Sequence, residues 1–294
     1  MKRKVDGVLL LDKPVGLSSN IALQKAKRLY RAEKAGHTGT LDPFATGLLP
    51  LCLGEATKFS QFLLAADKKY LAVVKLGVRT SSGDPEGDVI AQRPVNVGQA
   101  DLLAALTGFM GEIEQIPPMH SALKHAGRPL YEYARKGIEI ERKARRVTVH
   151  ELVVESFVGD VCTLRVHCGK GFYVRALADE LGEVLGCGAH LDGLRRTGVG
   201  PFQIEQAQSL EGLAELDEAQ RDGCLLPADI LAQALEQLRL DIEAAWQICH
   251  GQAIWLPRLT IGRQFRLYAP DGRFLGVGEV NQDGKVAPKR LVVT

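Results

Sequence analysis

Runs of apolar residues bounded by turn-forming residues predict the strands of a central β-sheet. Residues 8–11 and 48–53 are apolar runs, which is typical of strands buried in a sheet. Residues 69–77 are apolar on both faces, so we expect this strand to lie near the centre of the sheet. Residues 161–168 alternate between apolar and polar positions, which indicates a further strand.

Helix signals lie between and after these strands. Residues 18–20 (Ser-Ser-Asn) supply N-cap candidates for a helix that runs to about Tyr30. The polar face of this helix carries the cations Lys25, Lys27, Arg28 and Arg31. Further helices are predicted over residues 97–109, over residues 173–185 with Gly186 as the stop, and over residues 205–238 with a break at Pro227.

The pattern changes from about residue 240 onward. Short β-like runs at residues 265–268 and 274–280 alternate with Asp271-Gly272 and Asp283-Gly284 turns. The chain is long enough for one large domain and a small one. We therefore expect a first domain over residues 1–238 and a small all-β domain over residues 239–294.

Composition adds little, but the distribution of charge is informative. The 294 residues are 46% hydrophobic and 24% charged, with a formal net charge of +2, which is ordinary for a globular protein. Residues 1–60 carry ten Lys/Arg against five Asp/Glu, residues 120–150 carry eight against three, and residues 205–243 carry two against ten. This asymmetry favours one face that meets a polyanion, although a merely solvated basic surface gives the same pattern.

Several classes of protein are disfavoured. The six cysteines, at positions 52, 162, 168, 187, 224 and 249, show no Cys-x-x-Cys pair and no spacing typical of zinc. They are expected as reduced, mostly packed thiols, which fits the cytoplasm. Residues 1–6 lack the apolar core of a signal peptide, and no apolar run approaches the roughly 20 residues that span a bilayer. Residues 81–88 lack the acid spacing of a calcium loop, so we expect no metal there.

Asp42 is the strongest candidate for chemistry. It lies in the string Gly-His-Thr-Gly-Thr-Leu-Asp-Pro-Phe-Ala-Thr-Gly, residues 36–47. Pro43 disfavours the α region for Asp42, and the glycines permit tight turns and close approach of a ligand. This places an acid on a rigid loop, where catalytic groups often lie. The alternative is structural, since Asp42 followed by Pro43 is also a good helix start.

Residues 36–47 match every fixed position of G-H-x-G-x-L-D-P-x-A-T-G, the catalytic-loop pattern of the TruB family of pseudouridine synthases. The chain resembles this family from residues 7–14 to residues 288–291, nearly its entire length. The resemblance implies an α+β fold: a mixed, largely antiparallel sheet flanked by helices, with a small C-terminal all-β PUA-like domain that binds RNA in many proteins.

The resemblance also implies an activity. Members of the family isomerise the T-loop uridine-55 of tRNA to pseudouridine, breaking the C1′–N1 bond and rejoining the base through C5. The expected protein is a cytoplasmic monomer that binds the tRNA T-arm and uses no cofactor, no metal and no membrane. Two alternatives stay open: an RNA-binding or tRNA-folding protein whose catalytic residues are incidental, and a synthase that acts on other RNAs.

The family's site residues carry over to matching positions. Asp42, Tyr70 and Arg175 are expected to be catalytic, with Asp42 as the essential carboxylate. Arg175 lies in a run that resembles K-G-x-Y-x-R, and its expected position in the first turn of a helix disfavours a cation unless an anion is near. A bidentate pair with Asp42 would orient the acid, although an exposed arginine is the alternative.

Substrate-binding roles are implied for His37, Tyr70, Tyr173 and Leu194. His37 resembles the residue that fills the space left by the flipped base, with a general base or a plain loop histidine as the open alternatives. Tyr70, Tyr173 and Leu194 resemble contacts to that base. Taken alone, each aromatic residue and the leucine would more often be a core residue.

Further positions match the family near the site. Asp84 and Lys58 are expected there, and Lys13 is expected to contact phosphates. The basic segment 116–146 corresponds to an insertion that acts as a clamp over the tRNA T-arm.

Overall fold

The computed structural model describes residues 2–292, and its first domain is built on one mixed sheet. The strands follow the order β1-β3-β12-β4-β11-β10-β7, with β2 paired to β3 and β13 paired to β12. Their bounds are β1 Gly7–Lys13, β2 Ala35–His37, β3 Thr46–Leu53, β4 Lys68–Leu76, β7 Gly111–Gln115, β10 Arg145–Val158, β11 Val161–Cys168, β12 Ala189–Val199 and β13 Phe202–Gln203. Every pair is antiparallel except β3–β12, which confirms the expected mixed, largely antiparallel sheet.

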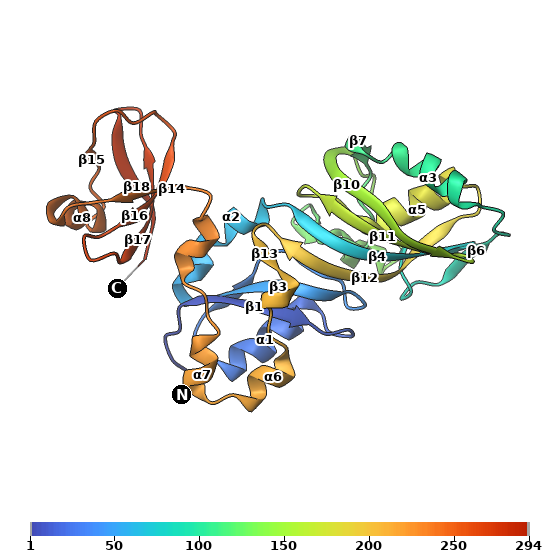
Figure 1. Ribbon diagram of the computed structural model, residues 1–294, viewed down its shortest axis with the longest axis horizontal. Helices are drawn as coiled ribbons and strands as arrows, with labels where there is room; N and C mark the ends of the chain where they lie inside the picture. The colour runs from blue at the N-terminus through green and yellow to red at the C-terminus, as the bar shows by residue number, and fades with distance from the viewer. Residues whose placement is uncertain (1, 293–294) are drawn as a thin grey trace.

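One face of this sheet is covered by helices (Figure 1). Helices α1 (Ser19–Leu29) and α6 (Leu210–Glu215) pack over β1 and β3, while α3 (Gln99–Thr107) and α5 (Val174–Val184) pack over the half that contains β4, β11 and β10. Each pairing forms its own apolar cluster. Tyr70 and Leu194 contact both clusters. The two cores therefore meet at the middle of the sheet.

The opposite face is covered only in part. Val8, Leu10, Leu48 and Cys52 form a third cluster with short helical segments there. These segments are η1 (Gly54–Phe59), α2 (Ser60–Leu64) and η3 (Ala228–Ala232). Along β4 the even-numbered residues 72, 74 and 76 are buried, whereas Lys69 and Leu71 are exposed. The expectation that β4 is apolar on both faces is therefore wrong, although its central position is right.

Other elements occur as short pieces. They are β5 (Val78–Thr80) and β6 (Val89–Gln92), the hairpin β8 (Lys124–His125) and β9 (Arg128–Pro129), helices α4 (Leu130–Ala134) and α7 (Glu218–Gly223), and η2 (Ile204–Gln206). The basic segment 116–146 leaves the sheet after β7 and returns at β10. The helices expected over 205–238 are shorter than the pattern indicated, since each is one or two turns long.

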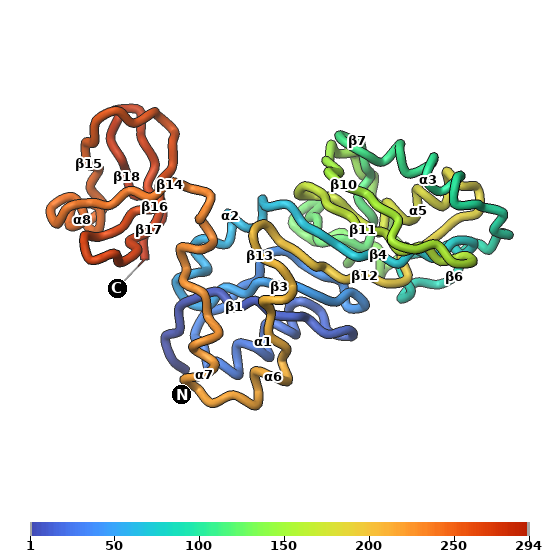
Figure 2. Tube along the Cα trace, viewed as in Figure 1, coloured from blue at the N-terminus to red at the C-terminus, as the bar shows by residue number. Residues whose placement is uncertain are grey.

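The small C-terminal domain has its own sheet. Its five strands follow the order β14-β16-β17-β18-β15, with bounds β14 Glu236–Arg239, β15 Ile254–Trp255, β16 Gln264–Tyr268, β17 Phe274–Val280 and β18 Lys285–Leu291. The domain also contains helix α8 (Ile242–Cys249), which an all-β pattern did not predict. Asp241 caps α8 by accepting a hydrogen bond from the Ala244 amide at 2.8 Å. Figure 2 shows the orange segment that carries the chain from α7 into β14.

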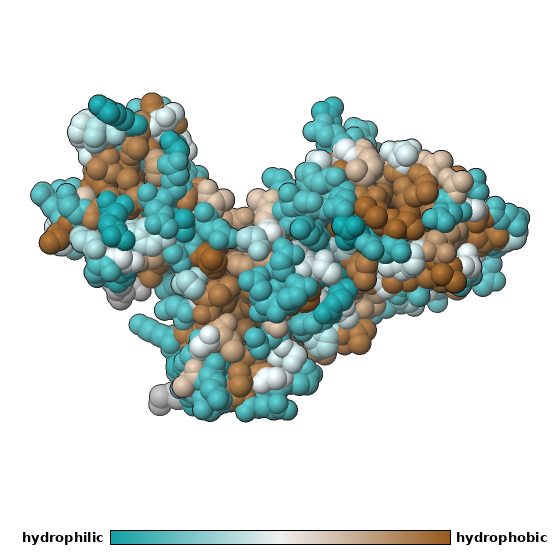
Figure 3. Space-filling model, viewed as in Figure 1, coloured by the Kyte–Doolittle hydropathy of each residue, from teal (hydrophilic) through white to brown (hydrophobic). Residues whose placement is uncertain are grey.

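Specific contacts join the two domains. The rings of Phe59 and Phe274 lie 5.2 Å apart, and the Tyr268 hydroxyl donates to Asp229 at 2.6 Å. Figure 3 shows an open notch between the small domain and the main body on the face in view. Among residues 2–292, no helix is long and apolar enough to cross a bilayer.

Candidate active site

Asp42 lies in the loop between β2 and β3, where the two cores meet. Ser19, on helix α1, holds the loop through two hydrogen bonds. Its hydroxyl donates to the Leu41 carbonyl at 2.9 Å and accepts from the Leu41 amide at 2.7 Å. The Asp42 carbonyl accepts from the Ala45 amide at 3.1 Å, which closes a turn. No helix begins at Pro43, since β3 starts at Thr46. The alternative interpretation of Asp42 as a helix cap is therefore wrong.

Arg175 is the cation that faces Asp42. Its Nε lies 3.0 Å from Asp42 Oδ2, and its Nη1 lies 3.4 Å from Asp84 Oδ2. The guanidinium also donates to the carbonyls of Ser82 at 3.2 Å and His120 at 2.5 Å. Only 6% of the Arg175 side chain is exposed. The expected partner is present, but the expected bidentate pair is not, because Arg175 divides its donors between two carboxylates and two carbonyls.

The position of Arg175 in its helix explains why it needs these anions. It is the second residue of α5, near the positive end of the helix dipole, where a cation is disfavoured. Asp84 is nearly fully buried and accepts from the Glu86 amide at 3.1 Å and from the Ser82 hydroxyl. The loop 81–88 therefore supplies a carboxylate to the site.

Burial and charge act in opposite directions on Asp42. Desolvation raises the pKa of the Asp42 carboxyl above its ordinary value, while Arg175 and Lys13 oppose that rise and Asp84 adds to it. The side chain of Asp42 keeps 32% of its surface exposed, so a substrate atom can reach it. The arrangement presents a partly desolvated carboxylate with a fixed cation beside it.

Three predicted base contacts line the same region. Tyr70 lies on β4, directly opposite Arg196 on β12 and Val166 on β11, and burial raises the pKa of its hydroxyl. Leu194 lies two residues before Arg196 on β12. Tyr173 is the N-cap residue of α5, two residues before Arg175. Tyr70 and Leu194 thus lie at the junction of the cores, and the charge of Asp42 acts on the hydroxyls of both Tyr70 and Tyr173.

His37 lies on β2, opposite Leu51 of β3. Its Nδ1 is buried and has no hydrogen-bond partner within residues 2–292. Burial lowers the pKa of the imidazole, and the nearby Arg196 lowers it further. A neutral imidazole with an unused ring nitrogen can exchange hydrogen bonds with an incoming polar group.

Two expectations for lysines need correction. Lys13 is fully buried, and its ammonium donates to the carbonyls of Pro14 at 2.8 Å, Leu17 at 2.7 Å and Pro43 at 3.3 Å. It therefore supports the Asp42 loop from inside and does not face a phosphate. Burial lowers the pKa of Lys13 to about 8.

Lys58 lies at the junction between the domains rather than beside Asp42. Its ammonium contacts Glu55 at 2.6 Å and donates to the Leu291 carbonyl at 2.9 Å. The sequence pattern could not distinguish these places, because each lysine also contacts a carbonyl that is distant in the chain, Pro43 for Lys13 and Leu291 for Lys58.

Three family models together cover most of the chain. Residues 27–174 match the model described as "TruB family pseudouridylate synthase (N terminal domain)". Residues 175–233 match "tRNA pseudouridylate synthase B C-terminal domain", and residues 237–292 match "Pseudouridine synthase II TruB, C-terminal". The chain belongs to the TruB family of pseudouridine synthases.

Curated members of the TruB family align over nearly the full chain. The tRNA pseudouridine synthase B of Vibrio vulnificus is 54% identical over 99% of this chain and 96% of its own length. The relative of the same name from Methylobacillus flagellatus is 52% identical over 99% of this chain and 97% of its own length. The relative from Burkholderia mallei is 54% identical over 100% of this chain and 99% of its own length.

Solved structures support the fold. A chain of the archaeal box H/ACA sRNP Nop10–Cbf5 complex superposes with a TM-score of 0.74 at 25% identity, covering 98% of this chain and 86% of that one. A chain of an H/ACA RNP bound to a substrate RNA containing 2′-deoxyuridine gives the same TM-score and identity, with 98% and 85% coverage.

Sequence reasoning missed a residue that holds this TruB-family site together. Arg196 is 1% exposed and has no carboxylate partner within the described residues. It donates to the carbonyls of Leu48 at 2.7 Å, Thr40 at 3.5 Å and Gly39 at 3.4 Å, and it also interacts with the Tyr70 hydroxyl. Arg196 therefore fixes both the Asp42 loop and Tyr70.

Gln115 is a second positioning residue that the sequence did not reveal. Its side-chain amide donates to the Tyr173 carbonyl at 3.1 Å and accepts from the Tyr173 amide at 2.8 Å. These two bonds fix the start of α5, and hence Arg175. Arg196 and Gln115 are distinguished by being polar and buried. Their burial follows from the order of the strands in the sheet, and the sequence pattern does not contain that order.

Proposed function

We propose that this protein converts uridine-55 in the T-arm of tRNA to pseudouridine. The observation that carries the proposal is the Asp42–Arg175 contact of 3.0 Å at the junction of two cores, in a chain of the TruB family. Its relatives bear the name tRNA pseudouridine synthase B. In this proposal the protein acts as a monomer in the cytoplasm and needs no cofactor.

The chemistry requires little beyond a carboxylate and a confined base. The C1′–N1 bond breaks, the uracil turns, a new bond forms from C1′ to C5, the proton on C5 leaves and N1 gains one. Asp42 acts on the sugar, either as a nucleophile at C1′ or as the base that removes a sugar proton. Arg175 keeps Asp42 ionised and oriented, because its positive charge opposes the effect of burial on the carboxyl.

The substrate uridine must leave its stack to reach Asp42, which costs a few kcal/mol. Tyr70, Tyr173 and Leu194 then form the walls that keep the free uracil in place, and His37 occupies the space left in the RNA. The segment 116–146 acts as a clamp over the RNA in this proposal. The carbonyl of its His120 accepts a hydrogen bond from Arg175. This hydrogen bond links the proposed clamp to the catalytic cation.

The test is tritium release from tRNA labelled at C5 of uridine. Wild type should release tritium from an unmodified transcript but not from one that carries cytidine at position 55. Asp42→Asn should lower the release rate by about 10²–10⁴-fold or more, because it removes the charge and keeps the shape, while tRNA affinity stays near wild type.

Three outcomes would contradict parts of the proposal. Substantial release by Asp42→Asn would remove Asp42 from its role. Release from the cytidine transcript at the wild-type rate would move the target away from position 55. Tight tRNA binding without release by the wild type would favour the RNA-folding alternative instead.

A further inference from the structure

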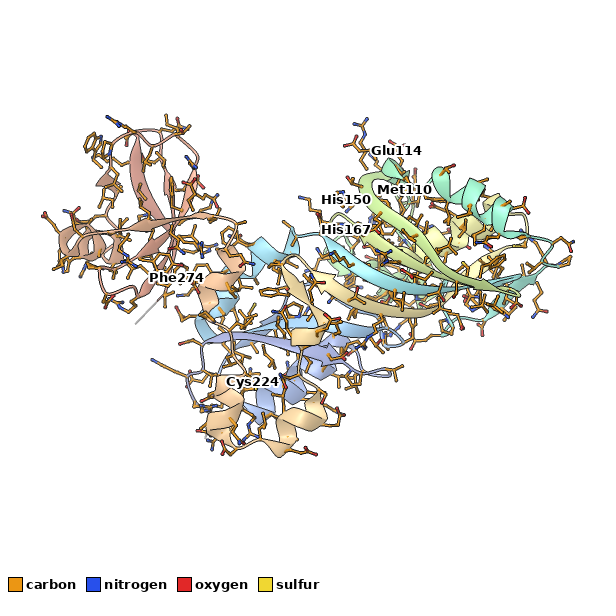
Figure 4. All side chains as sticks on the ribbon, in the orientation of Figure 1. Met110, Glu114, His150, His167, Cys224 and Phe274 are labelled. Atoms are coloured by element: carbon orange, nitrogen blue, oxygen red, sulfur yellow. The ribbon has the colours of Figure 1, made fainter. Side chains whose placement is uncertain are left out.

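A cluster of metal-ligating side chains lies on the open face of the large sheet. Asp67, His150 and His167 each offer one ligand atom, and these atoms lie within 4.8 Å of one another. Asp67 Oδ2 is 3.4 Å from His150 Nε2 and 3.9 Å from His167 Nε2. The two imidazole rings have centroids 4.8 Å apart. Figure 4 shows His150 and His167 together at one end of β10 and β11.

Strand topology, not sequence spacing, assembles this cluster. Asp67 immediately precedes β4, His167 lies near the end of β11, and His150 lies on β10, and these three strands are neighbours in the sheet. The register between β10 and β11 shifts between Val149 and Glu151, so His150 is the extra residue of a β-bulge. A bulge re-aims a side chain, which explains why His150 sits against His167.

The cluster is separate from the Asp42 site. Successive side chains of a strand point to opposite faces. Val166 lies opposite Tyr70 and is fully buried, whereas His167 lies opposite Lys69, which is exposed. His167 therefore faces the solvent side of the sheet, away from the cores that hold Tyr70.

The geometry matches the demands of a divalent transition-metal ion. Zinc bonds of about 2.0–2.2 Å to nitrogen and oxygen in a tetrahedron separate the ligand atoms by about 3.3–3.5 Å. The Asp67–His150 distance already has this value. The Asp67–His167 distance of 3.9 Å and the separation of the two histidine ligand atoms, which is within 4.8 Å, must shorten by rotation of these exposed and half-buried side chains. Two imidazoles and one carboxylate favour zinc or its neighbours over magnesium or calcium, which prefer all-oxygen sets.

Neighbouring contacts hold the residues around the candidate metal site. The Asp67 carbonyl accepts from the Gly200 amide at 2.8 Å, which anchors the residue just before β4. Glu151, the next residue after the bulge, is engaged by Arg165 at 2.6 Å and does not compete for an ion. Three protein ligands leave a fourth position for water.

We propose that Asp67, His150 and His167 bind one divalent transition-metal ion, with Zn²⁺ as the best match, and that the bound ion crosslinks β4, β11 and β10. The isomerisation itself needs no metal, so this is a structural or regulatory site in addition to the catalytic one. An ion held by three strands stabilises only the folded sheet.

Binding is measured on the full chain, stripped with a chelator and free of any affinity tag. Zn²⁺ is titrated in competition with a chromophoric chelator, and Co²⁺ serves as a second probe because its visible absorption reports on coordination. The variants are Asp67→Asn, His150→Gln and His167→Gln. His250→Gln is the matched control, since His250 is also exposed but lies on the C-terminal domain, outside the cluster.

We expect one ion per wild-type chain, an affinity lowered by about tenfold or more in each cluster variant, and no change in His250→Gln. Saturating Zn²⁺ should raise the melting temperature of the wild type by about 4 °C and leave that of His167→Gln unchanged. Tritium release should be equal for stripped wild type and His167→Gln. Equal affinity in wild type and all three cluster variants, or no Zn²⁺ binding by the wild type, would overturn the proposal.

Discussion

At the residue scale, the candidate site depends on a small number of shared contacts. Arg175 holds two carboxylates at once, and Asp84 is the more deeply buried of them. The charge of Asp84 raises the pKa of Asp42, whereas Arg175 lowers it. Burial is the main cause of the raised pKa of Asp42, and Asp84 adds to it from a position beside Arg175.

Asp84→Asn should move the acidic limb of the pH–rate profile to lower pH. The substitution removes a like charge near Asp42 and frees donors of Arg175 for it, and both changes lower the Asp42 pKa. Since the ionised carboxylate is the active form, activity is lost as pH falls through that pKa. The profile of kcat/KM checks this, with Asp88→Asn as an exposed control on the same loop. A limb that stays in place or moves to higher pH would contradict the argument.

Arg196→Met should lower turnover by about 10²-fold while tRNA affinity stays within a few-fold of wild type. The change removes the donors that hold the carbonyls of Gly39, Thr40 and Leu48, so the Asp42 loop loses its fixed position. Hydrogen exchange over residues 38–45 should become faster in the variant.

Arg195→Met is the matched control for that experiment. Arg195 is the neighbouring residue on β12, but it is partly exposed and pairs with Asp12 at 2.7 Å. Equal losses of turnover in the two variants would show that strand β12, rather than the Arg196 side chain, fixes the loop.

At the element scale, β3 and β12 form the parallel contact of the sheet, and this contact brings the Asp42 loop to Arg196. Thr46 and Gly47 lie opposite Arg195 and Arg196. Gly47 has φ of 104°, and a Cβ there would lie 2.3 Å from the Arg196 carbonyl oxygen. A side chain at this position would force the two strands apart.

Gly47→Ala should therefore lower the free energy of unfolding by about 2–4 kcal/mol and reduce turnover. The control is Gly36→Ala in the same motif, because a Cβ at Gly36 meets nothing within 4 Å and its φ is not in the positive region. Urea unfolding of both variants gives the comparison. A Gly47→Ala variant as stable as Gly36→Ala would mean that β3 and β12 can separate at little cost.

At the scale of the whole molecule, basic segments that are distant in sequence are available to a polyanion. The helix α1 and the segment 116–146 belong to the first domain, and Figure 3 shows the open notch between this domain and the small one. Contacts such as Tyr268–Asp229 and Phe59–Phe274 tie the small domain to the main body. These contacts hold both domains in place for the proposed binding of tRNA.

Affinity for tRNA should fall by about 10³-fold between 50 and 200 mM salt, because several phosphates release counterions on binding. Arg145→Ala and Arg146→Ala should each reduce the slope of log K against log salt by about 1, since both side chains are exposed. Lys75→Ala is the control, because Asp160 already contacts that ammonium at 2.5 Å. A tRNA affinity that does not change with salt concentration would contradict binding through phosphate contacts.

The sequence by itself determined the elements with strong local patterns and the identity of the family. The apolar runs placed β1, β3, β4 and β11, the cap and stop signals placed α1 and α5, and the Asp42 motif was sufficient to recognise the family. These signals are local, because periodicity, caps and turns depend on residues close together in the chain.

The tertiary structure decided what those residues touch. The burial of Lys13, the division of Arg175 between Asp42 and Asp84, and the role of Arg196 all join residues far apart in sequence. The Asp67–His150–His167 cluster likewise arises from strand order and one β-bulge. Such contacts follow from which strands become neighbours, and the period of a single strand carries no information about its neighbours.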